Sequence, residues 1–219
     1  MDGDWNRTER VGQKPRRARM GIDPCNAPAP SGTIDGMRRD SQRGATAVEM
    51  ALIGTLVIGL VFAIIEVSMA FRTRNSVGNA VSSGVRAASV GTNNTTADFN
   101  TVQAIADALD ITGVDITRVV VYRATSPTDS PSAACSGGTS VAGECNVYTP
   151  VHFALTDAQF GCGVSAPDRF YCPTSRSADV GSLELVGVEV TAEHHYMTGF
   201  LGDTFTFTTS QVLPVEPSG

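Results

Sequence analysis

Two glutamates bracket a long apolar stretch of the sequence, and their carboxylates need a chemical explanation. The stretch RGATAVEMALIGTLVIGLVFAIIEVSMAF runs from Arg43 to Phe71 and carries Glu49 and Glu66. A carboxylate inside a bilayer costs about 2.5–3.5 kcal/mol on insertion scales, so it normally has a partner or a function. Three interpretations are open: a soluble core helix, a membrane helix with functional charges, or a segment that leaves lipid for a protein assembly.

Four of the five cysteines lie in the acidic part of the chain, residues 72–219, and they suggest redox chemistry. Nine residues separate Cys135 from Cys145, and nine separate Cys162 from Cys172. An even number of cysteines is typical of disulfides in an oxidising compartment, and these spacings favour two local pairs, Cys135–Cys145 and Cys162–Cys172, among three possible connectivities. Zinc is the weaker interpretation because the short spacing of zinc knuckles is absent. The fifth cysteine, Cys25, stands alone.

The sequence contains no pattern typical of a catalytic site. The three histidines are His152, His194 and His195. The adjacent pair lies on a predicted strand, where neighbouring side chains point to opposite faces and cannot readily chelate together. Motifs of serine hydrolases, zinc proteases and nucleotide-binding loops are missing. We therefore expect no catalytic residues, no metal and no cofactor.

Charge divides the chain into three regions. Residues 1–44 hold nine Lys/Arg and six acids, whereas residues 72–219 hold seven Arg and fourteen acids. Between them, residues 45–71 carry only the two glutamates. This is the layout of a single-pass membrane protein whose basic N-terminal arm stays in the cytoplasm and whose acidic domain lies outside. The acidic domain also argues against nucleic-acid binding.

The basic arm, residues 1–44, is predicted to be a disordered leader. Its Pro- and Gly-rich composition shows no apolar periodicity. The KPRRAR cluster could bind nucleic acid or anionic lipid, but a solvated tail is the simpler interpretation. Translation could begin at Met1, Met20 or Met37, and a start at Met37 would leave a short basic leader before the apolar stretch.

The apolar stretch predicts a helix that begins in lipid and continues beyond it. Residues 45–71 would form about 40 Å of helix, enough to cross a hydrocarbon core of about 30 Å with some tilt. No proline occurs between Ala45 and Val90. After Phe71, apolar side chains recur at helical spacing with polar residues on the other faces. We expect one helix over 45–90, its second half packed on a domain, ended by Gly91.

The rest of the chain predicts an α+β domain. Asp98 is expected to cap a short helix with an apolar stripe. Four segments are predicted as strands: Ile116–Ala124, Tyr148–Leu155, Leu183–Tyr196 and Thr204–Leu213. The sum is a pilin-like arrangement: a long N-terminal helix, its first half transmembrane, packed on an antiparallel sheet whose loops are stapled by disulfides.

The head of the helix resembles a known type of export signal. A basic leader ends in Gly44, a small residue (Ala45) follows, Glu49 is the fifth residue after the glycine, and a long apolar helix begins. This is the pattern of prepilin signals. The N-terminal region is similar to the TadE-like family, the minor pseudopilins of tight-adherence (Flp-type) pilus systems. RGATAVE, FAIIE and the Asn75–Ala88 segment carry the resemblance, which is close over about 45 residues. The VEVTAEHHY strand, short turn and final strand match the family in layout.

The resemblance implies a processing event and a role for Glu49. A prepilin peptidase would cleave after Gly44 and leave a free amine on Ala45. The carboxylate of Glu49 would pair with the amine of a neighbouring pilin or pseudopilin, which would favour assembly and fix the axial register. The alternative is an interfacial glutamate at a helix N-terminus, where the helix dipole favours an anion.

Glu66 is expected to behave differently from Glu49. It lies 17 residues further along, about 26 Å up the helix. We expect it at the outer membrane–water interface, with Arg72 or Arg74 as its partner.

Two other classes of function stay open. One is a single-pass, membrane-anchored binding or sensor domain that keeps its basic arm. The other is a signal-anchored secreted enzyme. Cleavage after Gly44 separates the pseudopilin from both. The family pattern is also incomplete here, because the leader from Met1 is long and a frequent proline in the apolar stretch is replaced near Gly54.

Overall fold

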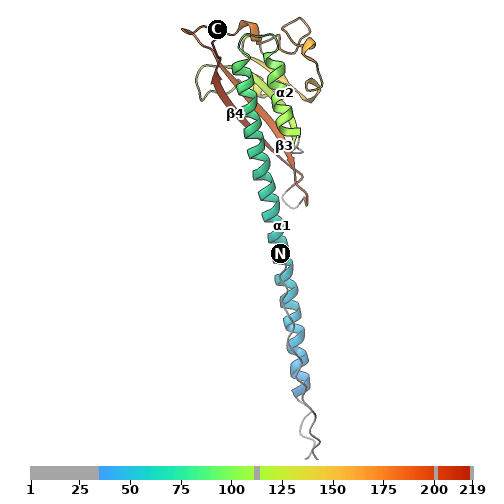
Figure 1. The fold of residues 1–219 in the computed structure, drawn as a ribbon. Coiled ribbons are helices and arrows are strands. Elements are labelled where there is room, and N and C mark those ends of the chain that lie inside the picture. The colour runs from blue at the N-terminus through green and yellow to red at the C-terminus, as the bar shows by residue number, and fades with distance from the viewer. Residues whose placement is uncertain (1–34, 111–113, 200–201, 218–219) are drawn as a thin grey trace, which may run out of the picture. The chain divides into compact units, whose positions relative to one another are not determined.

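The computed structural model describes residues 35–110, 114–199 and 202–217 (Figure 1). The chain divides into two compact units, residues 1–50 and 51–219. Most of the expected basic arm, including Cys25, Met1 and Met20, lies outside the described residues.

The first element is a single long helix, α1, which runs from Asp35 to Val90. It begins ten residues before the expected start, since no proline separates Asp35 from Ala45 and an acid favours a helix N-terminus. Within residues 51–219, the helix changes character along its length. The large apolar side chains from Leu52 to Phe71 are exposed, whereas Val77, Val81 and Val85 are completely buried.

The second helix, α2 (Ala97–Asp110), packs closely on the end of the first. A Cβ atom at Gly84 would lie 2.5 Å from Cγ1 of Ile105, and one at Gly91 would lie 2.7 Å from Cβ of Ala97. Both contacts are tighter than side chains tolerate. The two glycines therefore allow the helices to approach.

Four strands form one antiparallel sheet in the order β2-β1-β3-β4. The central pair is β1 (Asp115–Ala124) and β3 (Leu185–His195), with Val121 opposite Val188. The edges are β2 (Cys145–Tyr148) and β4 (Thr204–Pro214). The predicted α+β architecture, with a long helix on an antiparallel sheet, is confirmed.

The two faces of the sheet bury different residues. Alternate residues of β3, from Val186 to Ala192, and Val119 and Val121 of β1 form one core with α1 and α2, which lie on the same side of the sheet (Figure 1). The opposite face packs Val120 and Tyr122 against the short helix α3 (Ala133–Ser136). Both faces of the central strands are buried.

The predicted strand at Tyr148–Leu155 is wrong in position. The strand β2 ends at Tyr148, and a 3-10 helix, η1 (Pro150–His152), follows it. Pro150 has no N–H to donate to a sheet, and Thr149 and His152 form a reciprocal cap that starts the turn. Two further 3-10 helices, η2 (Asp157–Gln159) and η3 (Pro173–Ser175), lie in the expected loop region.

A glycine at the centre of the sheet makes room for an aromatic ring. Tyr122 lies opposite Gly187 across the β1–β3 pair and is 1% exposed. A Cβ atom at position 187 would lie 2.2 Å from Cζ of Tyr122. The ring is held at its far end, where its hydroxyl donates to the carbonyl of Asp129 at 2.9 Å.

We expect Gly187→Ala to destabilise the domain by about 1–3 kcal/mol, because the new methyl group overpacks the sheet against a ring that cannot withdraw. Urea unfolding of the full chain in detergent measures the loss. Gly181→Ala is the matched control, because a Cβ atom at position 181 meets nothing within 4 Å. Equal unfolding midpoints for the two variants would contradict this account of the sheet.

Candidate functional site

The exposed apolar half of α1 is the first candidate site. One helix among the described residues is long and apolar enough to cross a membrane, and none of its most apolar stretch is buried within the chain. A core helix of a soluble protein would be buried. The unburied surface therefore needs lipid or other protein segments to cover it.

The residues of the predicted export signal lie in this helix. Gly44, Ala45 and Glu49 are all helical and exposed. Among the described residues, none forms a hydrogen bond or ion pair with the Glu49 carboxylate. The peptide bond expected to be cut and the carboxylate expected to bind a neighbour's amine are thus on the surface of this segment.

Glu66 does not have the expected arginine partner. Its side chain is 2% exposed, and its Oε1 accepts a hydrogen bond from the backbone N–H of Thr198 at 2.6 Å. Thr198 lies in the connection between β3 and β4. The other oxygen, Oε2, is buried without a partner in the described part of the chain. The expectation of Arg72 or Arg74 as partner is wrong, because the hairpin reaches the helix first and both arginines stay exposed.

Two more hydrogen bonds tie α1 to the last two strands. The hydroxyl of Thr73 lies 3.2 Å from Nδ1 of His194, and the hydroxyl of Ser89 donates to the carbonyl of Pro214 at 2.5 Å. Together with Glu66, they attach the helix at three heights. The helix and the β3–β4 hairpin are therefore held together along their shared length.

The histidines of the chain serve structure and do not cluster. His195 is exposed and faces Asp115, with Nε2 and Oδ2 3.1 Å apart, while His194 contacts Thr73 and the ring of Tyr196. His152 caps η1. In the described residues, no group of three or more His, Cys, Asp or Glu side chains could hold a metal ion.

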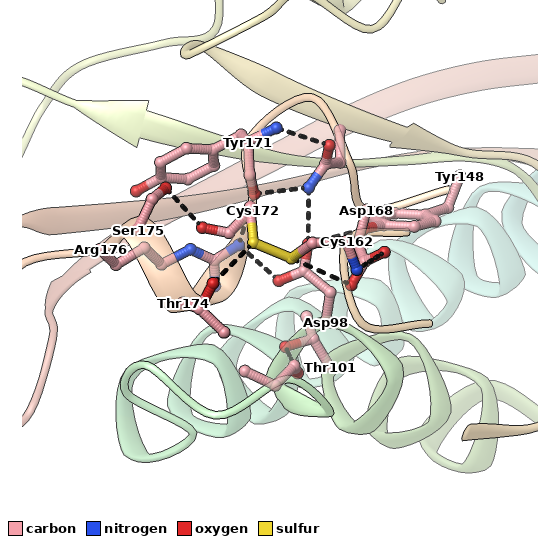
Figure 2. A network of polar contacts seen from close by, with 12 residues as sticks. Asp98, Thr101, Tyr148, Cys162, Asp168, Tyr171, Cys172, Thr174, Ser175 and Arg176 are labelled. Atoms are coloured by element: carbon pink, nitrogen blue, oxygen red, sulfur yellow. Dashed lines mark hydrogen bonds and ion pairs between the residues drawn. A yellow bond between two sulfur atoms is a disulfide. The ribbon is translucent and has the colours of Figure 1, made fainter. Parts of the chain in front are cut away.

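A buried polar network joins α2 to the loops over the sheet (Figure 2). Its centre is Asp98, which is completely buried. The Asp98 carboxylate accepts hydrogen bonds from Tyr148 at 2.6 Å, from Asn146 at 2.9 Å and from Arg176 at 2.5 Å. The sequence predicts that Asp98 caps a helix, but its side chain instead pairs with Arg176. Sequence reasoning also missed Asn146 and Arg176.

The environment of the network shifts the pKa of two of its members. Burial, reinforced by the Asp98 charge, raises the pKa of the Tyr148 hydroxyl well above its ordinary value. Burial disfavours the charge of Arg176, but Asp98 and the neighbouring tyrosines outweigh it, and the pKa of Arg176 rises. Arg176 also lies over the ring of Tyr171, with its Cζ 4.5 Å from the ring centre. These shifts keep Tyr148 neutral and Arg176 charged.

Two disulfides close the loops around this network and on the opposite face. Cys135 pairs with Cys145 beside α3, and Cys162 pairs with Cys172. These are the pairs that the spacing favours. The second loop encloses Asp168, whose carboxylate accepts the backbone N–H groups of Gly161 and Cys162 at 2.8 and 3.0 Å. The loops are therefore fixed by both covalent and charge-assisted contacts.

Comparison with known proteins identifies one family. Residues 44–86 match the family model described as TadE-like protein, which confirms the resemblance over the head of the helix. No curated protein and no solved structure matches the chain. TadE-like pilus proteins are structural proteins. The matched segment, with its long apolar helix, fits a pilin-like protein associated with a Tad pilus and a single-pass membrane anchor.

We expect Asp98→Ala to cost about 3–5 kcal/mol of unfolding free energy, because it leaves the Arg176 charge buried without its anion. Urea unfolding of the full chain in detergent measures the loss. The double variant Asp98→Asn, Arg176→Met should lose less, since it leaves no buried charge unpaired.

The ion pair of Arg123 and Glu184, which is partly exposed, provides the control. The Arg123 side chain is 47% exposed, so Arg123→Ala should cost no more than about 1 kcal/mol. If Asp98→Ala and Arg123→Ala are equally destabilising, the buried pair does not hold the loops as described.

Proposed function

We propose that the protein is a minor pseudopilin that acts in the assembly of a Tad/Flp-type pilus or its associated secretion machine. Residues 45–71 would anchor it in the cytoplasmic membrane, with the N-terminal arm in the cytoplasm and residues 72–219 outside. The observation that carries the proposal is the coincidence of two features: the family match starts at Gly44, and the helix that follows leaves its apolar surface uncovered.

Processing is the first step of the proposed function. A prepilin peptidase hydrolyses the peptide bond between Gly44 and Ala45. Water adds OH to the carbonyl carbon of Gly44 and a proton to the nitrogen of Ala45, which leaves a carboxylate on Gly44 and a free amine on Ala45. Exposure of both residues supports this step, because the protease must reach the bond. The distribution of charge supports the orientation, since the basic arm favours the cytoplasmic side.

The second step is assembly, in which Glu49 pairs with a neighbouring subunit. In a monomer surrounded by lipid, its carboxylate has no cation to offset its desolvation. In a bundle of pilin helices, the amine of a neighbour's first residue provides that cation, so pairing occurs only in the assembly. The proposed partners are therefore other pilins and pseudopilins, and the pairing sets how far each helix slides along the next.

The outer domain fits a structural role. Its disulfides and the buried network around Asp98 fix the loops that cover the sheet. The disulfides also suit an oxidising compartment outside the cytoplasmic membrane. We propose that this domain meets the other components of the pilus.

Cleavage after Gly44 can be tested directly. We expect co-expression with a prepilin peptidase to yield a mature chain whose first residue is Ala45, because the enzyme recognises the basic leader and the following helix. N-terminal sequencing of the purified protein measures it, and a peptidase with its catalytic aspartates replaced is the control. A chain that retains residues before Ala45 in both samples contradicts processing and favours a membrane-anchored binding domain.

The role of Glu49 has a separate test. We expect Glu49→Ala to leave membrane insertion unchanged, since it removes a charge from an apolar segment, and to reduce co-purification with the other pilins several-fold. Quantitative mass spectrometry of affinity-purified membranes measures both. Glu144→Ala removes an exposed acid from the outer domain and should have no effect on co-purification. Unchanged pilin recovery with Glu49→Ala would exclude the pairing.

A further inference from the structure

The end of the β3–β4 hairpin lies beside the last turns of the apolar segment. Glu66 lies within residues 45–71, and it holds the backbone N–H of Thr198 at 2.6 Å. Two turns further along the helix, Thr73 contacts His194. If residues 45–71 span the bilayer, these contacts bring the hairpin down to the level where the helix leaves the hydrocarbon core. This step rests on the proposed membrane anchor.

A groove opens at this level between the helix and the hairpin. It has a volume of about 220 Å³ and is lined by Val67, Ala70, Phe71, Arg74, Tyr196 and Phe205. Two aromatic rings remain partly uncovered there: Phe71 is 60% exposed and Phe205 is 49% exposed. Aromatic side chains at the boundary of a membrane span are typical of contact with the lipid interface.

A cationic group stands at the rim of the groove. Arg74 lines it, whereas Arg72 is two residues earlier, about 200° away around the helix, and faces another side. Among the described residues, neither arginine forms an ion pair, although the outer domain is rich in acids. A guanidinium group presents a fork of donors that matches the oxygens of a phosphate. The groove thus combines an apolar floor with a phosphate-binding rim.

We propose that this groove binds an anionic phospholipid of the outer leaflet, with its phosphate on Arg74 and its upper acyl chain against Phe71 and Phe205. The groove is continuous with the exposed apolar surface of the span, so the molecule that reaches it first is a lipid of the same bilayer. Glu66 positions the site, because its hydrogen bond holds the hairpin over the helix. The hairpin is then a second membrane contact of the outer domain.

The test places one tryptophan at a time in the full chain. Trp5→Phe removes the only native tryptophan. In that background, Phe205→Trp reports on the groove, Phe62→Trp reports on the span, and Val164→Trp is the control. Val164 is 96% exposed. In the same loop, a Cβ atom at Gly161 would lie 3.8 Å from Cβ of Thr95, which follows the end of α1 and is far along the helix from the apolar segment. Each variant is reconstituted in nanodiscs that contain lipids brominated near the carbonyl end of the acyl chain or near its methyl end.

We expect the bromine near the carbonyl end to remove most of the Phe205→Trp fluorescence and to leave Val164→Trp unquenched. Phe62→Trp should be quenched by the deeper bromine. If Phe62→Trp is quenched and Phe205→Trp is not, the groove does not bind a lipid, whereas the proposed membrane anchor is supported. If neither is quenched, the anchor and the groove both fail. A Phe205→Trp signal protected from acrylamide and unquenched by bromolipid overturns the lipid in favour of a second copy of the chain.

The cationic rim is tested by lipid composition. We expect quenching of Phe205→Trp to be stronger in phosphatidylglycerol-containing discs than in purely zwitterionic ones, and we expect this difference to disappear in the variant Arg74→Gln. Arg86→Gln removes an exposed arginine further along the same helix and should preserve the difference. Quenching that is equal in both lipid compositions, or a difference that survives loss of Arg74, overturns the selection of an anionic headgroup.

Discussion

The packing of the second half of α1 against the sheet is the contact on which the rest of the domain depends. Val77, Val81 and Val85 are fully buried between the helix and the strands, and α2 closes over them. The same helix continues without a proline into an apolar stretch that no described residue buries. One helix therefore faces two environments, and the change between them occurs within a few turns around Glu66.

Two buried carboxylates join distant segments at the two ends of the domain. At the lower end of the domain, the Glu66 carboxylate binds the backbone of the hairpin. At the upper end, the Asp98 carboxylate gathers Asn146, Tyr148 and Arg176 from the loops that cover the sheet. Each carboxylate joins segments that are far apart in the sequence. The disulfide Cys162–Cys172 then closes the loop that carries part of this network.

The regular elements could be predicted from the sequence because their signals are local. The absence of proline and the helical spacing beyond Phe71 indicate α1, and alternation indicates β3 and β4. Strand β2 is predicted too late in the chain, because its four residues are all buried and show no alternation, and Pro150, two residues after its end, excludes a strand there. The cap predicted at Asp98 rests on a local motif, whereas the partners of its side chain lie 48, 50 and 78 residues away. The partner of Glu66 could not be predicted for a related reason. It is a main-chain N–H 132 residues later, and because every residue except proline has such a group, the sequence does not indicate which one binds.

The triple attachment of α1 to the hairpin has a mechanical consequence. Because the hydrogen bonds at Glu66, Thr73 and Ser89 act at different heights, the outer domain cannot swivel around the helix. Successive residues of an α-helix are offset by about 100°, so a neighbour that engages a position one residue further along the apolar segment turns the whole domain by that angle. The choice of contact within the membrane thus sets the azimuth of the domain outside it. The helix–helix contact in lipid therefore determines which face of the sheet and which loops the outer domain presents to the next molecule.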